Sequence, residues 1–507
     1  MNKYILTGTS AKDYITALHK QASALSDHAI REGIDVIAAQ MKKDVLNAPD
    51  TLDVSGKTVY YISEKNGNDD NDGLSKETPL KTISALSKYQ PIHDAAILFE
   101  RGGIYRGTFV FTPHTYYGAY GDPSQPKPLI MQSKRNYADP ALWVETEYPN
   151  VYRCTELFCN VGVIGFDHDL FDYSEKCYDE LYGEVEGVGE NGFTGVQDLN
   201  KDLQFYSVIP GQPTYMELKK GIPSDLYIYS EKGNPGERFK SIEIGEREGI
   251  FRGNPVENII ENIAMKFTGA HAVGTDSMEG LTVRGCVVSW VGGSVLSVDY
   301  LGCGSPARYG NAIEGQNCDR FVCENNWAYQ IYDTGLTHQR GICDETVILK
   351  NLNYTCNLVE YCHWSIEFYN DSRGKTEGRY SLIENQYIAY NLCRFTGYGW
   401  GSIVTERWDE SQAYHGSSYG ITKNLKTEYT IFDRSAGYLL NVVPGFNINE
   451  NNNIYIQHLG NTLGYLNGIY HKCDEKMSEY IVSEWKDENG IVILIDPEKE
   501  PTEKLFK

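Results

Sequence analysis

Three short segments of the sequence place a polar side chain at the same point after an apolar residue. They are AIE at 312–314, GLTHQ at 335–339 and SIEFY at 365–369. If each segment is a strand whose apolar residue points inward, Glu314, Thr337 and Glu367 point outward in one column, because strand side chains alternate between faces. A slip of one residue in the pairing would reverse these faces.

Paired carboxylates in such a column are suited to hydrolysis of a glycosidic bond, which needs one group as acid and another as base or nucleophile. Neighbouring strands lie about 4.8 Å apart, so two spacings would separate Glu314 from Glu367 by about 9–10 Å. That separation is near the upper end of the range for inverting glycosidases. Asp333, four residues before Thr337, is expected at the corner between the glutamates. We therefore predict Asp333, Glu367 and Glu314 as catalytic carboxyls, with His338 as a further proton donor or substrate ligand.

Each of these residues also has a structural interpretation. A glutamate on an outward strand face is often solvated or salt-bridged. Asp333, in the segment YDTG, could cap a turn, and His338 could be a satisfied residue of the strand wall.

Aromatic and charged residues nearby are candidates for sugar binding. Trp400 and Tyr398, in FTGYGWGS, have ring faces that match the C–H face of a pyranose, although a stacked aromatic ladder explains them equally well. Arg407 and Asp409, in TERWDE, could grip hydroxyls or a carboxylate, or could form a solvated ion pair. The other predicted substrate contacts are Asp299, Gln339, Arg340, Tyr369 and His363, the last of which could instead pack beside Trp364.

Other catalytic patterns are missing from the sequence, which has no GxSxG, no P-loop, no dinucleotide fingerprint opening a helix and no HExxH. NGNDDNDG at 66–73 begins like a calcium loop, but the twelfth position counted from Asn68 is Pro79, where such a loop needs a bidentate glutamate. We expect the Asp and Asn side chains there to cap turns instead. We predict no metal and no cofactor for a hydrolase, and calcium only for the lyase alternative described below.

The elements that would position these groups repeat along the chain. Each unit is a short strand, a polar corner and a second short strand. A repeating unit of about 20–25 residues with insertions predicts a stacked solenoid and disfavours a β-sandwich. Asparagine and glycine suit the corners because they tolerate left-handed backbone. The predicted corners, 23, 40, 26 and 34 residues apart, are Asn262, Gly285, Asn325, Asn351 and Asn385.

Three segments carry a resemblance to a known class of proteins. They are YYISEKNGNDDNDGLSKETPLKTISAL at 60–86, GNPGERFKSIEI at 233–244 and NAIEGQNCDRFVCENNWAYQIYDTGLTHQ at 311–339. Over roughly residues 57–445 the chain resembles the right-handed parallel β-helix proteins of the pectate-lyase-like class, in their bacterial carbohydrate-active form. The resemblance implies an all-β, right-handed parallel β-helix and a carbohydrate substrate. It leaves the reaction open, because this architecture hosts lyases, hydrolases, epimerases and phage tailspikes.

The predicted domain organisation has three parts. Residues 1–56 form a helical segment that caps the solenoid, with a helix over 10–47 that begins at Ser10 and is interrupted near Gly33. Residues 57–445 form the β-helix, with a hairpin-rich insertion at about 165–235 that borders the groove. Residues 446–507 supply closing strands or a cap.

Composition limits the partners. The net charge of −23 argues against nucleic acid or an anionic membrane surface. No apolar run is long enough to span a membrane, and the first residues lack the apolar core of a signal peptide, so we predict a cytoplasmic protein. The 12 cysteines include no CxxC pair, which favours reduced, buried thiols. The sequence does not indicate an oligomeric state.

Three functions are consistent with these observations, and we favour a glycoside hydrolase that acts on a plant or microbial oligo- or polysaccharide. The alternative is a polysaccharide lyase or uronate epimerase, in which a base such as Arg340, His338 or Tyr369 abstracts a proton beside a carboxylate. The third is a non-catalytic glycan-binding solenoid, which would have an aromatic groove without converging titratable groups.

Overall fold

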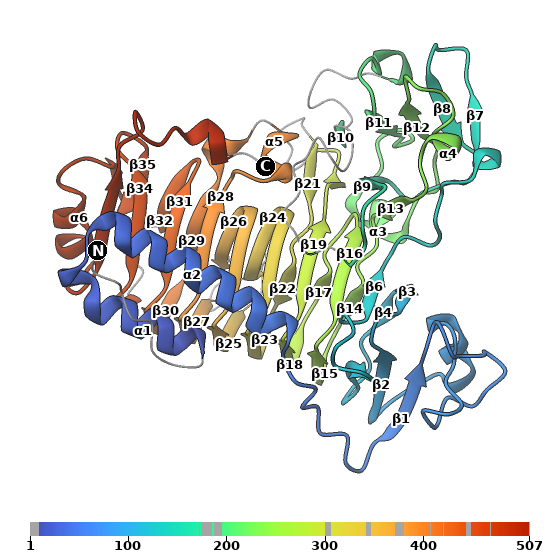
Figure 1. The fold of residues 1–507 in the computed structure, drawn as a ribbon, viewed down its shortest axis with the longest axis horizontal. Helices are drawn as coiled ribbons and strands as arrows, with labels where there is room; N and C mark the ends of the chain where they lie inside the picture. The colour runs from blue at the N-terminus through green and yellow to red at the C-terminus, as the bar shows by residue number, and fades with distance from the viewer. Residues whose placement is uncertain are drawn as a thin grey trace.

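The computed structural model describes residues 10–171, 173, 185–186, 195–299, 306–340, 346–370, 380–405, 407–418, 420–442, 448–466 and 468–505. These residues form a nearly all-β molecule, an elongated parallel β-helix with two helices along one side (Figure 1). The solenoid predicted from the repeats is therefore confirmed. Its coils present three faces, and corresponding strands of successive coils pair in parallel.

The first face is a 10-stranded parallel sheet. In spatial order its strands are β1 (Thr58–Ile62), β2 (Ala95–Glu100), β5 (Tyr116–Tyr120), β15 (Val256–Glu261), β18 (Met278–Arg284), β23 (Cys318–Glu324), β25 (Val347–Thr355), β27 (Ser381–Ala389), β30 (Ile421–Glu428) and β33 (Ile448–Asn451).

The second and third faces belong to one 18-stranded sheet, because the long strands β24 (Trp327–Arg340) and β26 (Leu358–Asn370) bend from one face into the other. The second face also contains β3 (Ile104–Arg106), β6 (Leu129–Met131), β16 (Ala264–Thr268), β19 (Val287–Val291), β28 (Leu392–Thr396), β31 (Ile431–Ser435), β34 (Ile454–His458) and β37 (Ile491–Ile495). The third face also contains β4 (Phe109–Val110), β14 (Phe251–Gly253), β17 (Val273–Thr275), β22 (Ile313–Gln316), β29 (Gln412–Ser418), β32 (Tyr438–Val442), β35 (Thr462–Leu466) and β36 (Ile469–Lys472).

The corners between the first and second faces use left-handed residues, as predicted for Asn262, Gly285 and Asn325. The prediction was wrong for Asn351 and Asn385, which lie inside β25 and β27. Both have positive φ, at a kink within the first face where their side chains are exposed and hydrogen-bonded to each other. The corners of those two coils are Cys356 and Tyr390.

Just inside the corners, buried asparagines form a ladder that joins successive coils. The side-chain oxygen of Asn357 accepts the backbone N–H of Asn326, and that of Asn391 accepts the N–H of Asn357, each at 3.0 Å. The side-chain amide of Asn357 donates in turn to the Cys323 carbonyl, at 2.9 Å. The ladder satisfies backbone groups that the turn removes from the sheet.

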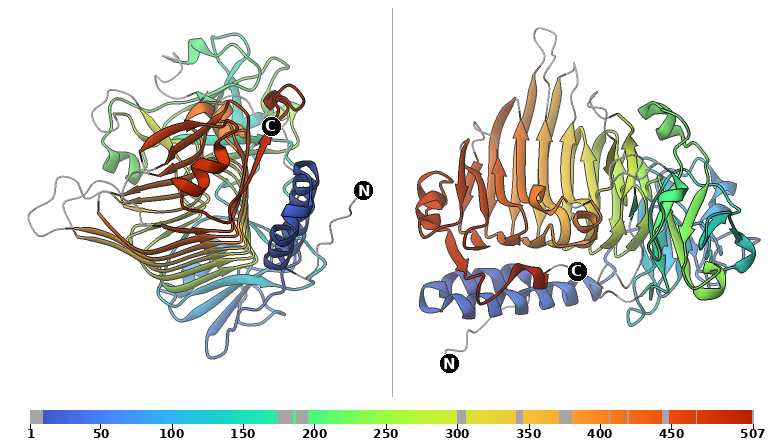
Figure 2. Two further views of the ribbon diagram at one scale, coloured as in Figure 1. Left: turned by 90° about the vertical axis from the view of Figure 1, so that its left-hand side faces the viewer. Right: turned by 90° about the horizontal axis from the view of Figure 1, so that it is seen from above.

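The N-terminal region is helical, as predicted, in α1 (Ala11–Gln21) and α2 (Asp27–Leu46), with Ser10 accepting the Asp13 N–H at the start. The helix is interrupted at 22–26 and not at Gly33, which lies inside α2 where a side chain would meet Leu18. The two helices run lengthwise along the outer surface of the second face instead of covering an end (Figure 2).

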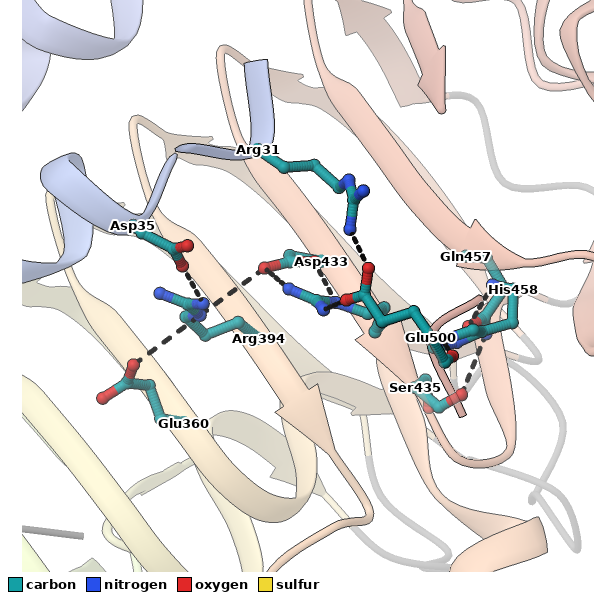
Figure 3. Close-up of polar contacts among 10 residues, drawn as sticks. Arg31, Asp35, Glu360, Arg394, Asp433, Ser435, Gln457, His458 and Glu500 are labelled. Atoms are coloured by element: carbon teal, nitrogen blue, oxygen red, sulfur yellow. Dashed lines mark hydrogen bonds and ion pairs between the residues drawn. The ribbon is translucent and has the colours of Figure 1, made fainter. Parts of the chain in front are cut away.

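The second face is covered because its outer side also carries a column of apolar side chains, beside a column that contains charged ones. Ile34, Ile37 and Met41 of α2 are fully buried in one cluster with outer residues such as Trp327 and Leu358. Ion pairs reinforce the contact, with Arg394 of β28 joined to Asp35, Glu360 and Asp433, and Arg31 joined to Glu500 (Figure 3).

The ends of the solenoid are closed by other segments. At the C-terminal end, α6 (Met477–Ser483) inserts the fully buried Met477 and Ile481 into the interior. At the other end the segment NGNDDNDG does cap turns, since Asp69 accepts the N–H groups of Lys81 and Thr82, and Asp72 accepts that of Leu74.

The insertion is wider than the predicted 165–235. It contains a small mixed sheet and an antiparallel pair that project from the solenoid wall. Its elements are β7 (Trp143–Glu145), β8 (Val151–Cys154), β9 (Val161–Phe166), β10 (Val185–Glu186), β11 (Phe205–Ser207), α3 (Tyr215–Lys220), β12 (Leu226–Tyr229), α4 (Pro235–Arg238) and β13 (Ile242–Glu246). A second, smaller excursion pairs β20 (Ser294–Ser297) with β21 (Ala307–Tyr309), and α5 (Trp400–Ile403) packs on β24 and β26.

Two further observations concern the whole chain. None of the helices in the described segments combines the length and apolarity needed to span a bilayer. The nine cysteines within the described residues are free thiols, and seven of them are buried.

Candidate active site

The third face carries the predicted column of polar side chains. Glu314 of β22 pairs with Thr337 of β24, and Thr337 pairs with Glu367 of β26. The residues before them, such as Leu336, are fully buried in the interior, so the column points outward. Period-two alternation was sufficient to predict this register.

Glu367 lies in a polar but nearly closed environment. Its Oε2 accepts hydrogen bonds from the hydroxyls of Thr337 at 2.9 Å and Thr334 at 3.3 Å, and only 8% of the residue is exposed. Burial, reinforced by the charges of Asp333 and Glu314, raises the pKa of Glu367 to about 8. A carboxyl in this state carries a proton at neutral pH and can donate it.

Asp333 lies where β24 bends from the second face into the third, at the irregularity in its pairing with β26. Burial raises the pKa of Asp333 to about 6, the Arg407 guanidinium opposes that rise, and the charge of Glu314 adds to it. No hydrogen bond to the Asp333 carboxyl is found within the described residues, and the residue is half-buried. It is therefore a less strongly shifted carboxyl than Glu367 and one that faces solvent.

Glu314 is held by three neighbours. The side-chain amides of Asn311 and Gln316 donate to its two oxygens at 2.6 and 2.7 Å, and Nδ1 of His271 lies 3.0 Å from Oε2. Asn311 also accepts the backbone N–H of Thr334, which links this cluster to the bend at Asp333. The three predicted carboxyls thus form one electrostatically coupled group.

Four predicted site residues are in the wrong place for contact with a substrate. His338 points into the solenoid, where Tyr354 and Gln386 hydrogen-bond both ring nitrogens, and burial lowers its pKa to about 3. The same alternation that turns Thr337 outward turns His338 inward, which rules out its predicted role as a proton donor to substrate.

The predicted sugar platforms are also buried. Trp400 is fully enclosed beside Trp290 and donates its indole N–H to the Gln330 carbonyl, so it anchors α5 on the bend. Tyr398 is 1% exposed. His363 is 2% exposed, hydrogen-bonded to Ser402 of α5, and burial holds its pKa well below the usual range.

The other predicted substrate contacts lie nearer the surface. Gln339 and Tyr369 pair with each other and point outward next to the column, and Arg340 ends β24. Asp299 is exposed on the loop after β20, and Asp409 is exposed in a short 3-10 helix, Trp408–Glu410, before β29. Arg407 lies 5.4 Å from the Tyr332 ring and influences Asp333, as described above.

Aromatic side chains farther along the third face were missed. The pairing continues the column from Glu367 to His415, Asn441 and Tyr465, while Trp364 lies in the adjoining column that ends in Tyr438. The ring of Trp364 lies 4.7 Å from His415, and Tyr438 stacks on Tyr465 at 6.2 Å. Extending the strand alignment beyond residue 370 would have found Tyr438 and Tyr465, whereas Trp364 was considered only as a packing partner of His363.

At the other end of the column, Glu314 lines a cavity of about 390 Å³. Its walls come from α3 and β13 of the insertion, from β17, and from β21 and β22. The third face therefore has a partly open cavity at one end, coupled carboxyls next to it and an aromatic surface beyond. Within the described residues, no group of three or more His, Cys, Asp or Glu side chains is arranged to hold a metal ion.

Comparisons with known proteins add little to this description. No family model and no curated protein sequence matches the chain. Among solved structures, a GH136 lacto-N-biosidase from Eubacterium ramulus aligns over 96% of this chain and 75% of its own, with 10% identity and a TM-score of 0.36. A structure described as a glycoside hydrolase aligns over 78% of this chain and 95% of its own, with 11% identity and a TM-score of 0.30. Similarity at this level transfers no activity or substrate to this chain.

Proposed function

We propose that this protein is a glycoside hydrolase, with Glu367 as the acid and Asp333 as its ionised carboxylate partner. The observation that carries the proposal is the coupled group of Glu314, Asp333 and Glu367 on the outward side of the third face. Hydrolysis of a glycosidic bond requires two carboxyl groups in different protonation states, and this pair has them near neutral pH.

Each group has a distinct task in this reaction. Glu367 donates its proton to the leaving oxygen. The proton neutralises the negative charge that develops on this oxygen as the bond breaks. Asp333, which Arg407 helps to keep ionised, acts on the sugar or on a water molecule. Glu314 faces the cavity and binds the sugar there, while its charge raises the pKa of both other carboxyls.

The aromatic surface beyond the carboxyls suits the rest of a glycan. Trp364, Tyr438 and Tyr465 lie on β26, β32 and β35 of the third face, where their ring faces can pack on pyranose C–H groups. From Glu314 to Tyr465 the column crosses five strand spacings, or about 24 Å. This length favours an oligo- or polysaccharide over a free monosaccharide.

A screen of aryl glycosides and oligosaccharides tests the proposal. We expect hydrolysis with a bell-shaped pH profile that falls below about pH 6 and above about pH 8, since these two apparent pKa values belong to the coupled pair. Asp333→Asn and Glu367→Gln should each lower turnover at least about a hundredfold. Glu324→Gln, on the first face, is the matched control and should keep wild-type turnover.

The assay also separates the alternatives. Wild-type rates in both Asp333→Asn and Glu367→Gln would exclude this pair as the catalytic carboxyls. Release of unsaturated sugar products would identify a lyase. Binding of glycans without any product from the whole panel would identify a carbohydrate-binding solenoid.

A further inference from the structure

The cavity beside Glu314 is less acidic than the protein as a whole, because its lysine and arginine side chains outnumber its carboxylates, which are those of Glu246, Glu248, Asp276 and Glu314. The protein as a whole carries a net charge of −23, yet five lysine and arginine side chains line this one cavity. Three of the cations are neutralised by partners, as Lys134 pairs with Glu246, Arg252 with Glu248 and Lys219 with Asp276. The remaining two are Arg247 and Lys220, which form no ion pair within the described part of the chain, although the charge of Lys220 acts on Glu217.

Arg247 is held rigidly in the cavity wall. Only 9% of the residue is exposed, its Nε donates to the Val295 carbonyl at 2.8 Å, and its guanidinium lies 5.2 Å from the Tyr309 ring. Its Nη2 donates to the Leu296 carbonyl at 3.4 Å, and Nη1 has no hydrogen-bond partner within the described residues. A buried guanidinium that lacks a counter-charge is costly, because burial removes water from the charge without replacing it.

A guanidinium in this state is suited to an anionic ligand. Its planar N–H groups match a carboxylate or a sulfate ester, and such charge-assisted bonds are strong in a site of low water content. The aromatic rings of Tyr309 and Tyr215 at 5.2 and 5.9 Å restrict the side chain to one orientation. The cavity volume of about 390 Å³ is large enough for a sugar residue with such a substituent.

We propose that this cavity binds an anionic sugar residue, one that carries a carboxylate or a sulfate ester, through Arg247. The inference rests on the proposed glycosidase site, because Glu314 belongs both to the cavity wall and to the carboxyl column. A glycan whose acidic residue occupies the cavity extends over the carboxyls toward the aromatic surface. The acidic surface elsewhere then disfavours binding of that residue anywhere but in the cavity.

Equilibrium binding tests this proposal without requiring turnover. Calorimetric titrations of the full-length Glu367→Gln variant use glucuronate, galacturonate, N-acetylneuraminate and glucose 6-sulfate, each compared with a neutral sugar of the same ring. We expect at least about tenfold tighter binding of one or more acidic sugars, and a loss of this preference at high salt. Comparison of the carboxylate sugars with glucose 6-sulfate shows which of the two substituents the cavity binds.

Variants locate the site. Arg247→Met should remove the preference for acidic sugars, and Arg247→Lys, which keeps the charge but loses the planar fork, should retain part of it. Arg153 of β8 is partly exposed, lies outside the cavity and pairs with Asp225; Arg153→Met is the matched control and should bind like the parent. Arg247 also donates hydrogen bonds to two carbonyls, so its replacement could affect folding. Circular dichroism and thermal melting of Arg247→Met test whether the variant is folded.

The outcomes distinguish this proposal from the function on which it rests. Equal binding of acidic and neutral sugars by the folded parent overturns the anionic cavity, even if hydrolysis by Asp333 and Glu367 is found. Arg247-dependent binding of acidic sugars without any hydrolysis supports the cavity and removes the hydrolase. A preference that survives in Arg247→Met places the anion elsewhere and overturns the assignment.

Discussion

The carboxyl of Glu367 keeps a proton for catalysis at neutral pH because its environment is unfavourable for the charged form. Burial contributes most to the rise of its pKa, and the like charge of Asp333 adds to it. Both effects act by raising the free energy of the ionised form in the folded protein. The unfolded chain has neither effect, so the residue that we propose as acid also lowers stability wherever it ionises.

Replacement of Glu367 by glutamine should therefore stabilise the protein in a pH-dependent way. The folded carboxyl has a pKa of about 8, above the ordinary value of 4.5, so the folded state binds more protons than the unfolded state between these values. The free energy of unfolding of the wild type then falls as pH rises from about 4.5 to about 8, by an amount on the order of a few kcal/mol. Glu367→Gln lacks this loss and still accepts hydrogen bonds from both threonines.

Thermal melting of the two proteins at pH 5 and at pH 8.5 measures the difference. We expect nearly equal melting temperatures at pH 5 and a higher one for Glu367→Gln at pH 8.5. Thr337→Ser keeps both carboxyls and a hydroxyl donor, and should follow the wild-type pH dependence. A lower melting temperature for Glu367→Gln at pH 8.5 would contradict the elevated pKa.

At the scale of the elements, the strands of the third face could be predicted from sequence because their alternation is regular. Glu314, Thr337 and Glu367 each directly follow an apolar residue. A single strand register therefore turns the apolar residue inward and the polar one outward in all three coils. The corners were harder, because Asn351 at a strand kink and Asn325 at a corner both adopt the left-handed region. An asparagine in the sequence indicates left-handed backbone, but it does not show whether that backbone lies at a corner or at a kink within a strand.

The buried ladder gives a sharper criterion for a corner than the left-handed residue does. Asn357→Ala leaves the Asn326 N–H and the Cys323 carbonyl without partners in a dry site, so we expect a loss of roughly 3 kcal/mol in the free energy of unfolding. Asn351→Gly removes only exposed side-chain hydrogen bonds and keeps the left-handed backbone, so its cost should be much smaller. Urea denaturation followed by circular dichroism compares the two. Equal losses would mean that the ladder contributes no more than an exposed asparagine.

For the whole molecule, the docking of the N-terminal helices depends on contacts that no local pattern reveals. Arg394 and Asp35 are 359 residues apart in sequence, and Arg31 meets Glu500 across nearly the full chain (Figure 3). The helices themselves were predictable from their apolar stripe, but the face they cover was not. The second face carries apolar side chains on both sides, as parallel sheets covered by helices do, and the apolar column along its outer side explains the lengthwise position.

The ion network between α2 and the solenoid should respond differently to changes at its two ends. Arg394 is 7% exposed at its side chain and lies between Glu360 and Asp433, which are 2% and 1% exposed. Arg394→Met leaves these carboxylates with less positive charge in a dry site, and we expect about 3 kcal/mol of destabilisation. Asp35→Asn removes a partner whose side chain is 64% exposed, so its cost should stay below about 1 kcal/mol.

Hydrogen exchange of the α2 amides shows where the stability is lost. If the helices act as a cover for the second face, Arg394→Met should speed exchange in α2 and in the facing strands β26 and β28 together, because exposure of one apolar surface exposes the other. Faster exchange in α2 alone, with unchanged protection of β26 and β28, would mean that the solenoid holds its second face without the helices. Because the carboxyl column lies on the third face, Asp35→Asn should bind glycans as the wild type does, which separates docking of the helices from the site.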